Sequence, residues 1–516
     1  MNRIICAVVM SVVSLANGLV AGEAGKNWRI DSAEDWKGAA QQIEGLAVDN
    51  DLLSPTGKQG TYRSQLQRFE SKRSAQTMTL TASTQWENWE PTQEKVTPPT
   101  LSDAPIMLVK GPGDYWLLGR NKAPRKAGFK PEAATLEGFD VALQTTPYPH
   151  LFDAPGGLKK SAGGYHAWQS HDMVNWVHHG AVTAKHAKWS TTAEFVDGKA
   201  YIYYDFPNDQ DPHLYIDDDL TDGKPGQDMG LVFKDPSDGS DCAFIRDLDG
   251  KFHVIYEDWS PIDASKHSWD SPLAGHAVSD DGKGDFTILP PAVDERTQPT
   301  GKFAEYPHPH WHKEDPNNFP GKVATKDVPK DRVKAGDTTA FAKYELHEHE
   351  QNAFGDWAAI AIGGQYYLVG DYHPAHEAIR IGLFTSSSLD QQFEFIGELG
   401  SGHPDPDIGF AEGKFYLVNQ TKHDYVSPGP WVEKVTARVG VDTSNDGTAD
   451  VWSDWQELKE QYDYIEGFSK QVQRVPASMD LSQLPAGYGF CFELKLQDTT
   501  NNQSKPMLES IEIRFE

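Results

Sequence analysis

Three aspartates stand directly in front of short apolar stretches. Asp103 precedes APIMLVKG, Asp241 precedes CAFIRD and Asp356 precedes WAAIAIGG. Carboxyl groups perform general acid and base catalysis when a fold brings two of them together, one protonated and one ionised. The alternative is structural, because an Asp before a hairpin often caps or closes the turn through its own backbone. Chemistry is favoured if all three converge on one place.

The segments around these aspartates form a repeat. A stretch of alternating apolar residues, a Gly or Asp-Gly turn and an aromatic-rich strand occurs five times, and each copy predicts a β-hairpin. The copies begin at Asp103, Thr192, Asp241, Asp356 and His403, and outer-strand candidates begin at Tyr165, His213, Gly275 and Ile379. A hairpin with two outer strands is one propeller blade. The repeat therefore predicts an all-β fold with a five-bladed β-propeller over residues 101–432; a β-sandwich with similar hairpins is the alternative.

The repeated segments also resemble a known family of enzymes. The likeness is carried by Asp103-Ala-Pro, SHDMVNW from Ser170, the segment from Trp189, CAFIRDLDGK after Asp241, and the Gly-Ser-Gly-His run ending at His403. These segments are similar to glycoside hydrolase family 43 and its five-bladed relatives in families 32, 62 and 117. The resemblance covers residues 100–430, although the segments at Trp189 and Asp241 lack the family's proline.

The resemblance implies a glycosidase that uses carboxylate acid/base catalysis and needs no cofactor for its chemistry. Its substrate would be a plant or algal polysaccharide or oligosaccharide, cleaved with inversion. Asp103 would be the base, and Asp241 would raise the pKa of the acid by repulsion. Direct displacement requires carboxyl groups roughly 6.5–9.5 Å apart, and closer approach would indicate a covalent intermediate.

The general acid cannot be carried over directly from the family, because the family's Glu-Gly-Pro is absent before the fourth hairpin, which begins at Asp356. Asp356 is the first candidate and Glu350 the second; family 117 relatives use a His there, so His347, His349 or His373 are further candidates. The predicted substrate contacts are Glu194, His403, Trp189 and His373. Glu194 can equally be a solvated rim carboxylate, and His403 a hydrogen-bonded structural residue.

Two other functions stay open on the sequence alone. A non-catalytic carbohydrate-binding propeller predicts aromatics around the channel without a close set of carboxyl groups. A polysaccharide lyase needs a neutralising cation or Arg together with a Tyr or His base, and the His-rich insert over residues 290–350 keeps it open. Histidines in this insert could bind a transition metal; they are His308, His310, His312, His347 and His349. Polar loop residues are the favoured interpretation of these histidines, because the insert lacks the spacing of a strong metal site.

A second possible metal site lies near the C-terminus. Asp442, Ser444, Asp446 and Asp450 match positions one, three, five and nine of an EF-hand-like loop, with Gly447 at position six. Position twelve is Ser453, where such a loop has a bidentate Glu. The segment predicts either a structural calcium site or an acidic β-hairpin turn, and the missing Glu favours the turn.

The two ends of the chain are expected to lie outside the propeller. Residues 1–24 have the charged, apolar and small-residue regions of a secretory signal peptide, with cleavage between Gly18 and Ala24, which predicts a periplasmic or extracellular protein. Residues 25–100 and 433–516 alternate apolar and polar residues, and we hypothesise that together they form one β-sandwich split around the propeller, with the run ending at Asp103 as linker.

The overall composition restricts the partners. A net charge of −29 and a pI near 5.0 argue against nucleic acid and anionic membranes, and no apolar stretch suits membrane insertion. The expected partner is a carbohydrate. Cys242 and Cys491 fall in different predicted domains; they could form one disulfide, but two buried free thiols are favoured.

Overall fold

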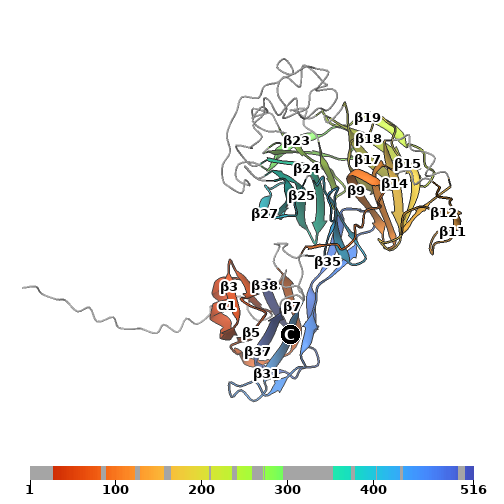
Figure 1. Cartoon of the computed structure of the whole chain (residues 1–516). Helices are drawn as coiled ribbons and strands as arrows, with labels where there is room; N and C mark the ends of the chain where they lie inside the picture. Colours follow the sequence, from red (N-terminus) through yellow and green to blue (C-terminus); the bar gives the residue numbers. More distant parts are fainter. Residues whose placement is uncertain are drawn as a thin grey trace, which may run out of the picture.

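The computed structural model describes most of the chain between residues 27 and 516. The described ranges are 27–82, 89–122, 128–155, 164–207, 211–234, 241–258, 271, 273–293, 353–373, 378–402, 404–429, 434–497 and 506–516. The predicted signal peptide, Glu350, His403 and the insert beyond residue 293 lie outside them. Figure 1 shows two bodies of β-structure, a propeller in orange to teal and a sandwich of red and blue strands below it.

Five sheets form the propeller blades, and each predicted hairpin supplies the two innermost strands of one sheet. Blade one is β9 (Leu101–Gly111), β10 (Asp114–Asn121), β14 (Tyr165–Ser170), β15 (Trp176–Ala181), β13 (Leu151–Asp153), β12 (Leu143–Thr145) and β11 (Ala133–Ala134). Blade two is β16 (Ser190–Val196), β17 (Lys199–Asp205), β18 (Pro212–Asp217) and β19 (Gln227–Leu231). Blade three is β20 (Ala243–Arg246), β21 (Phe252–Glu257), β22 (Ala274–Ser279) and β23 (Thr287–Val293).

The last two blades contain strands from distant parts of the chain. Blade four is β24 (Ala353–Ile362), β25 (Gln365–His373), β26 (Arg380–Ser386) and β27 (Glu394–Leu399), extended on its inner side by β35 (Gln471–Val475) and β34 (Gln461–Tyr464). Blade five is β28 (Asp407–Ala411), β29 (Lys414–Val418), β30 (Tyr425–Ser427) and β8 (Glu90–Pro91). The propeller thus includes β8, which precedes residue 101, and β34 and β35, which fall within the 433–516 segment.

The blades close into a ring. The innermost strands contact one another in the order β9, β16, β20, β24, β28 and back to β9. A separate apolar cluster fills each space between neighbouring blades; Tyr204 packs with Leu118 between blades two and one, and Val418 with Met107 between blades five and one. Strands buried on both faces explain the continuous apolar runs of the repeat, such as AYIYY in β17. The prediction of a five-bladed β-propeller is confirmed.

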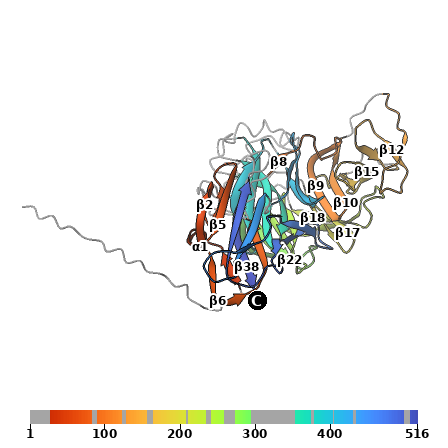
Figure 2. The same cartoon turned by 90° about the horizontal axis from the view of Figure 1, so that it is seen from below.

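Both ends of the chain contribute to the accessory sandwich. One sheet contains β3 (Leu46–Asp49), β4 (Leu52–Pro55), β38 (Leu508–Phe515), β7 (Ala75–Ala82), β36 (Ala477–Asp480) and β1 (Asn27–Ile30). The other contains β2 (Ala40–Glu44), β5 (Gln59–Ser64), β37 (Gly487–Gln497), β31 (Val435–Asp442), β32 (Val451–Trp452), β33 (Gln456–Leu458) and β6 (Gln67–Arg73). A single core that includes Trp36, Met78, Phe492 and Ile513 lies between them. Red and blue strands accordingly alternate in Figure 2.

Two smaller features complete the described part of the chain. The helix α1 (Ala33–Ala39) begins at Ser32, whose hydroxyl accepts a hydrogen bond from the Asp35 backbone N–H. None of the described helices is long and apolar enough to cross a membrane. Cys242 and Cys491 are buried and free, as expected.

Candidate functional site

Four aspartates with an uncommon backbone conformation stand at the heads of inner strands. Asp103, Asp241, Asp356 and Asp405 have φ of 69°, 58°, 48° and 38° in blades one, three, four and five. The left-handed region costs a non-glycine residue roughly 1–2 kcal/mol, and Asp is among the residues that tolerate it best. Such strain persists only where surrounding structure imposes it, and it concentrates at functional sites. Asp405 was not among the predicted site residues.

The ends of the second strands of blades one, two and four help to fix three of these heads. The Arg120 guanidinium pairs with Asp103, with 2.5 Å between Nη1 and Oδ2. Oδ2 of Asp205 accepts a hydrogen bond from the Asp241 backbone N–H at 2.9 Å. Oδ1 of Asp371 accepts one from the Asp405 backbone N–H at 2.8 Å. A charged residue at one repeated position therefore holds a strand head in its own blade or in the next.

The aspartate heads gather at one mouth of the propeller. The hydroxyl of Tyr165 donates to the Ala104 carbonyl at 3.0 Å. Burial raises the pKa of Tyr165 well above its usual value, and the negative charges of Asp103, Asp405 and Asp356 raise it further, although Arg120 opposes them. Asp241 adjoins them, because its carbonyl accepts a hydrogen bond from the backbone N–H of Trp357 at 3.0 Å.

Three carboxylates of this mouth are especially close. Asp356, Asp371 and Asp405 each present an oxygen atom within 4.8 Å of the others. Carboxylates at such spacing repel one another, which favours the protonated form of one of them. They are also close enough for one cation to contact all three. This arrangement suits proton transfer by Asp356.

The predicted aromatic contact lies at the same mouth. The half-buried Trp189 ring has the Arg120 guanidinium 5.2 Å and the Lys188 ammonium 4.8 Å from its centroid. Arg120 therefore touches both Asp103 and Trp189. His373, another predicted substrate contact, is 1% exposed at the end of β25, where it pairs with Ala353.

The prediction that Glu194 meets sugar at the rim is wrong. Glu194 is 1% exposed, and its Oε1 accepts hydrogen bonds from the backbone N–H groups of Ser469 at 2.6 Å and Phe195 at 3.2 Å. At about 3.3 Å per residue it lies about 13 Å along β16 from Ser190 at the strand head. Burial raises the pKa of Glu194 to about 7. Glu194 is therefore a buried residue that binds backbone N–H groups, and it is neither a substrate contact nor a solvated rim carboxylate.

The opposite end of the channel is occupied by the hairpin of β34 and β35. β35 pairs with Ala361 and Ile362 of β24, and Ala361 lies about 16 Å along the strand from Asp356. The hairpin contacts every blade: Tyr464 with Tyr115 (Oη to Oη, 3.0 Å), Ser469 with Glu194, Gln471 with the Arg246 carbonyl (2.7 Å), β35 with β24, and Lys470 with Asp407 (2.8 Å). In Figure 1 the β35 segment lies where the propeller meets the sandwich.

The acidic loop after β31 forms a closed turn. Asp442 accepts hydrogen bonds from the backbone N–H groups of Asn445, Asp446 and Gly447, and Asp450 accepts from Thr443 and Ser444. Asp446 accepts from Thr448. These contacts are those of the acidic hairpin turn that the sequence favoured, and calcium at Asp442, Ser444, Asp446 and Asp450 stays a prediction.

Residues that the sequence analysis missed include Arg120, Tyr165, Asp371 and Asp405. A signal for Asp371 was present, because YLVGD ends as YIYYD does at Asp205. Arg120 and Tyr165 have no such signal, since their roles depend on contacts across strands.

The similarities of this chain to known proteins are distant. No protein-family model matches the chain, and no curated protein matches it. Among solved structures, it is similar to an α-L-arabinofuranosidase from Clostridium thermocellum (11% identity, 75% of this chain and 97% of that chain, TM-score 0.35). It is also similar to an endo-arabinase from Bacteroides thetaiotaomicron (12% identity, 66% and 97%, TM-score 0.37). A third is an exo-β-1,3-galactanase from Phanerochaete chrysosporium with bound β-1,3-galactotriose (9% identity, 85% and 100%, TM-score 0.35).

The strand pairing and the ring of contacts between inner strands make the described part of the chain a five-bladed β-propeller with an accessory β-sandwich.

Proposed function

We propose that this protein is a glycoside hydrolase that cleaves a plant or algal polysaccharide or oligosaccharide. The observation that carries the proposal is the close set of Asp356, Asp371 and Asp405, whose carboxylate oxygens lie within 4.8 Å of one another. Asp241 is bound to the Asp356–Trp357 peptide, and Asp103 directly precedes the residue whose carbonyl binds Tyr165. These aspartates are far apart in the sequence. An Asp that only closed its own turn would not have to lie near the others.

Each residue has a distinct part in the proposed reaction. Asp103, held by Arg120, is the base that takes a proton from the attacking water. Asp356 gives its proton to the leaving glycosidic oxygen, and Asp371 and Asp405 favour its protonated form by repulsion. Direct displacement inverts the anomeric carbon and needs no covalent intermediate.

The two alternative functions fit the site less well. A non-catalytic binding propeller has no need of a close carboxylate set. A lyase needs a neutralising cation and a Tyr or His base. Among the described residues of the mouth, Arg120 is paired with Asp103, and Tyr165 is buried with its pKa raised well above its usual value; the His-rich insert lies outside the described residues. Tyr165 is therefore a poor base near neutral pH.

A polysaccharide panel tests the proposal. Wild-type protein is incubated with arabinan, xylan, galactan and algal glucans, and products are followed by reducing ends, ultraviolet absorbance and proton NMR. Hydrolysis with inverted anomeric configuration supports it. An unsaturated, ultraviolet-absorbing product indicates a lyase, retained configuration indicates a covalent intermediate, and binding without turnover indicates a binding propeller.

Export of the protein is part of the proposal. Residues 1–24 act as the signal peptide, with cleavage between Gly18 and Ala24. Amino-terminal sequencing of the native protein tests this: an N-terminus between residues 19 and 25 is expected, and an intact Met1 would contradict it.

A further inference from the structure

A cavity of about 700 Å³ opens beside the mouth, between blades one and five. Its lining includes Asp103, Pro98, Met173, Val174, Lys122 and Gln420. This volume is within the roughly 300–1,000 Å³ of pockets that enclose small ligands. Asp103 thus borders both the mouth and this cavity.

Local strain marks the cavity as a built feature. His150 and Met173 have φ of 57° and 58°, so they share the left-handed conformation of Asp103 and line the same cavity. The turn at Met173 is held by Asp172, whose Oδ1 accepts hydrogen bonds from the backbone N–H groups of Val174 at 2.8 Å and Asn175 at 2.7 Å. Val174, which lines the cavity, is 52% exposed.

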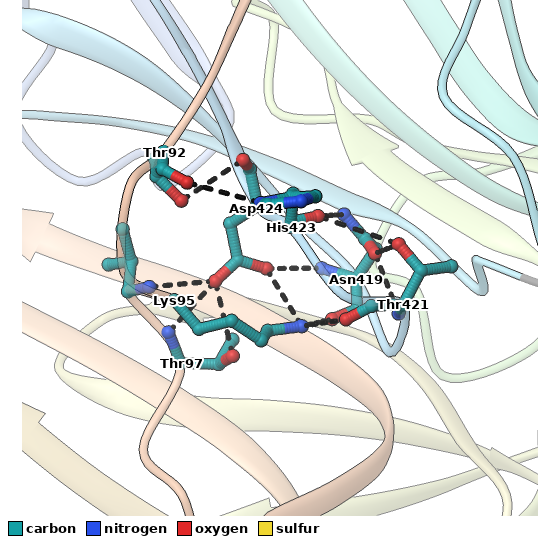
Figure 3. Close-up of polar contacts among 8 residues, drawn as sticks. Thr92, Lys95, Thr97, Asn419, Thr421, His423 and Asp424 are labelled. Atoms are coloured by element: carbon teal, nitrogen blue, oxygen red, sulfur yellow. Dashed lines mark hydrogen bonds and ion pairs between the residues drawn. The ribbon is translucent and has the colours of Figure 1, made fainter.

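The opposite wall is fixed by a buried carboxylate. Asp424 accepts hydrogen bonds from the backbone N–H groups of Val96 at 2.8 Å and Thr97 at 3.0 Å, and its Oδ1 lies 3.2 Å from the Lys95 ammonium. Figure 3 shows how these contacts join the segment before β9 to the loop after β29. We call this network, residues 92–97 with 419–424, the clasp. It holds the Pro98 wall in place before any ligand arrives.

The charges of the cavity select the class of ligand. Lys95 is paired with Asp424, and Asp103 with Arg120. Of the other charged lining residues, Lys122 and Glu94 have opposite signs. The cavity therefore has no excess charge for an anionic sugar. Apolar groups of Pro98, Met173 and Val174 suit the C–H faces of a neutral sugar.

The position of the cavity selects which part of the substrate would enter. Asp103 lines it, whereas Asp241, Asp356, Asp371 and Asp405 do not. In direct displacement the base and the leaving group are on opposite faces of the sugar ring. We infer that the cavity binds uncharged sugar units on the non-leaving side of the cleaved bond, so that the enzyme favours substrates with more than one unit there. This inference rests on the proposed function.

Chain-length dependence tests the inference. Neutral oligosaccharides of one to about six units, of the type cleaved in the panel, are compared in wild type and Val174→Trp. The exposed Val174 allows a Trp to fill the cavity with little effect on the core. The ratio of kcat/KM for long over short substrates should fall by about tenfold or more, through KM. Val141→Trp, at a 46% exposed Val outside the lining, is the matched control and should keep the wild-type ratio.

Several outcomes would overturn the inference. A ratio within about twofold of wild type in folded Val174→Trp does so, and so does a preference for uronic or sulfated oligosaccharides. If Val174→Trp does not fold, the same kcat/KM ratio is measured in Val174→Glu instead. If nothing is hydrolysed, calorimetric titration with the same neutral oligosaccharides separates the claims: binding that Val174→Trp abolishes supports the cavity while the hydrolase proposal fails, and absence of binding overturns both.

Discussion

The mouth and the interior of the propeller channel hold their carboxylates in different ways. At the mouth, Asp103 and Asp356 are partly exposed and strained, and Asp356 lies close to Asp371 and Asp405. Deeper in the channel, Asp407 and Glu194 are fully buried and bound by the hairpin of β34 and β35. Asp407 accepts hydrogen bonds from the Lys470 ammonium at 2.8 and 2.9 Å and from the Met107 backbone N–H at 2.6 Å.

The difference separates groups kept for folding from groups kept for chemistry. A buried charge requires a partner, and Lys470 supplies one for Asp407. Burial raises the pKa of Asp407, and the Lys470 ammonium opposes that rise. The carboxylates of Asp356, Asp371 and Asp405 repel one another, although Asp371 also holds the backbone of Asp405. The comparison predicts that mutations of Asp103 and Asp356 remove activity and that mutations in the interior of the channel remove stability.

The largest expected effect is on turnover in Asp103→Asn. The amide cannot accept a proton from water, so kcat should fall about 100- to 10,000-fold. Its ion pair with Arg120 is partly exposed, so the free energy of unfolding should change by no more than about 1 kcal/mol. Asp218→Asn, at a 75% exposed carboxylate, is the control and should match wild type in both measurements. Activity within about tenfold of wild type would end the assignment of Asp103 as base.

Lys470→Met should have the largest effect on stability. It leaves the Asp407 charge buried without its ammonium partner, at a cost of about 3–5 kcal/mol in the free energy of unfolding at neutral pH. The cost should shrink at low pH, where Asp407 takes up a proton. Urea denaturation measures it, and Lys470→Met with Asp407→Asn should recover much of the loss. A Lys470→Met variant within about 1 kcal/mol of wild type would show that the channel interior is not held by this pair.

A smaller loss of stability is expected when the hydrogen bonds of the clasp are removed. Asp424→Ala leaves the backbone N–H groups of Val96, Thr97 and Asn419 without their acceptor, which should lower the free energy of unfolding by about 2–3 kcal/mol. Asp424→Asn keeps one acceptor oxygen and should lose less. Equal stability of Asp424→Ala and wild type in urea would contradict a structural role for the clasp.

Between pH 7.5 and 5, the smallest expected stability effect, about 2 kcal/mol, comes from the titration of a buried histidine. Burial, followed by the nearby His253, lowers the pKa of His276 to about 3. Folded His276 stays neutral while unfolded His276 takes a proton below about pH 6.5, so its contribution is complete above pH 6.5 and is lost as pH falls towards 3, by about 1.4 kcal/mol per pH unit.

Denaturation of His276→Gln between pH 7.5 and 5 measures that contribution. The variant should lack this part of the pH slope, whereas His186→Gln, at an exposed histidine, should keep the wild-type slope. Parallel slopes in His276→Gln and wild type would contradict the assignment.

The sequence predicted the hairpins, the position of the mouth and the shared sandwich, because these features follow from local patterns. Alternating apolar residues around Gly turns, such as Gly198 with φ of 81° and Gly250 with φ of 90°, predicted the hairpins. The aspartates before those hairpins predicted the mouth. Strands at both ends of the chain predicted a shared sandwich.

What could not be read depends on contacts between distant segments. β8 has two residues and β35 has five, and both exist because a blade edge or inner strand is there to pair with them. Glu194 was misplaced because the pattern does not say how far along the channel each residue of β16 lies. The clasp partners of Asp424 are more than 300 residues away in sequence.

Chemical rescue of Asp103→Gly tests the central claim most directly. Gly suits the left-handed backbone at this position, so the variant should fold. Azide, a small anion that can occupy the vacated space and attack the anomeric carbon, should raise turnover about tenfold or more and give a glycosyl azide of inverted configuration. A folded Asp103→Gly that binds substrate but is not accelerated by azide would contradict the assignment of the mouth carboxylates to chemistry.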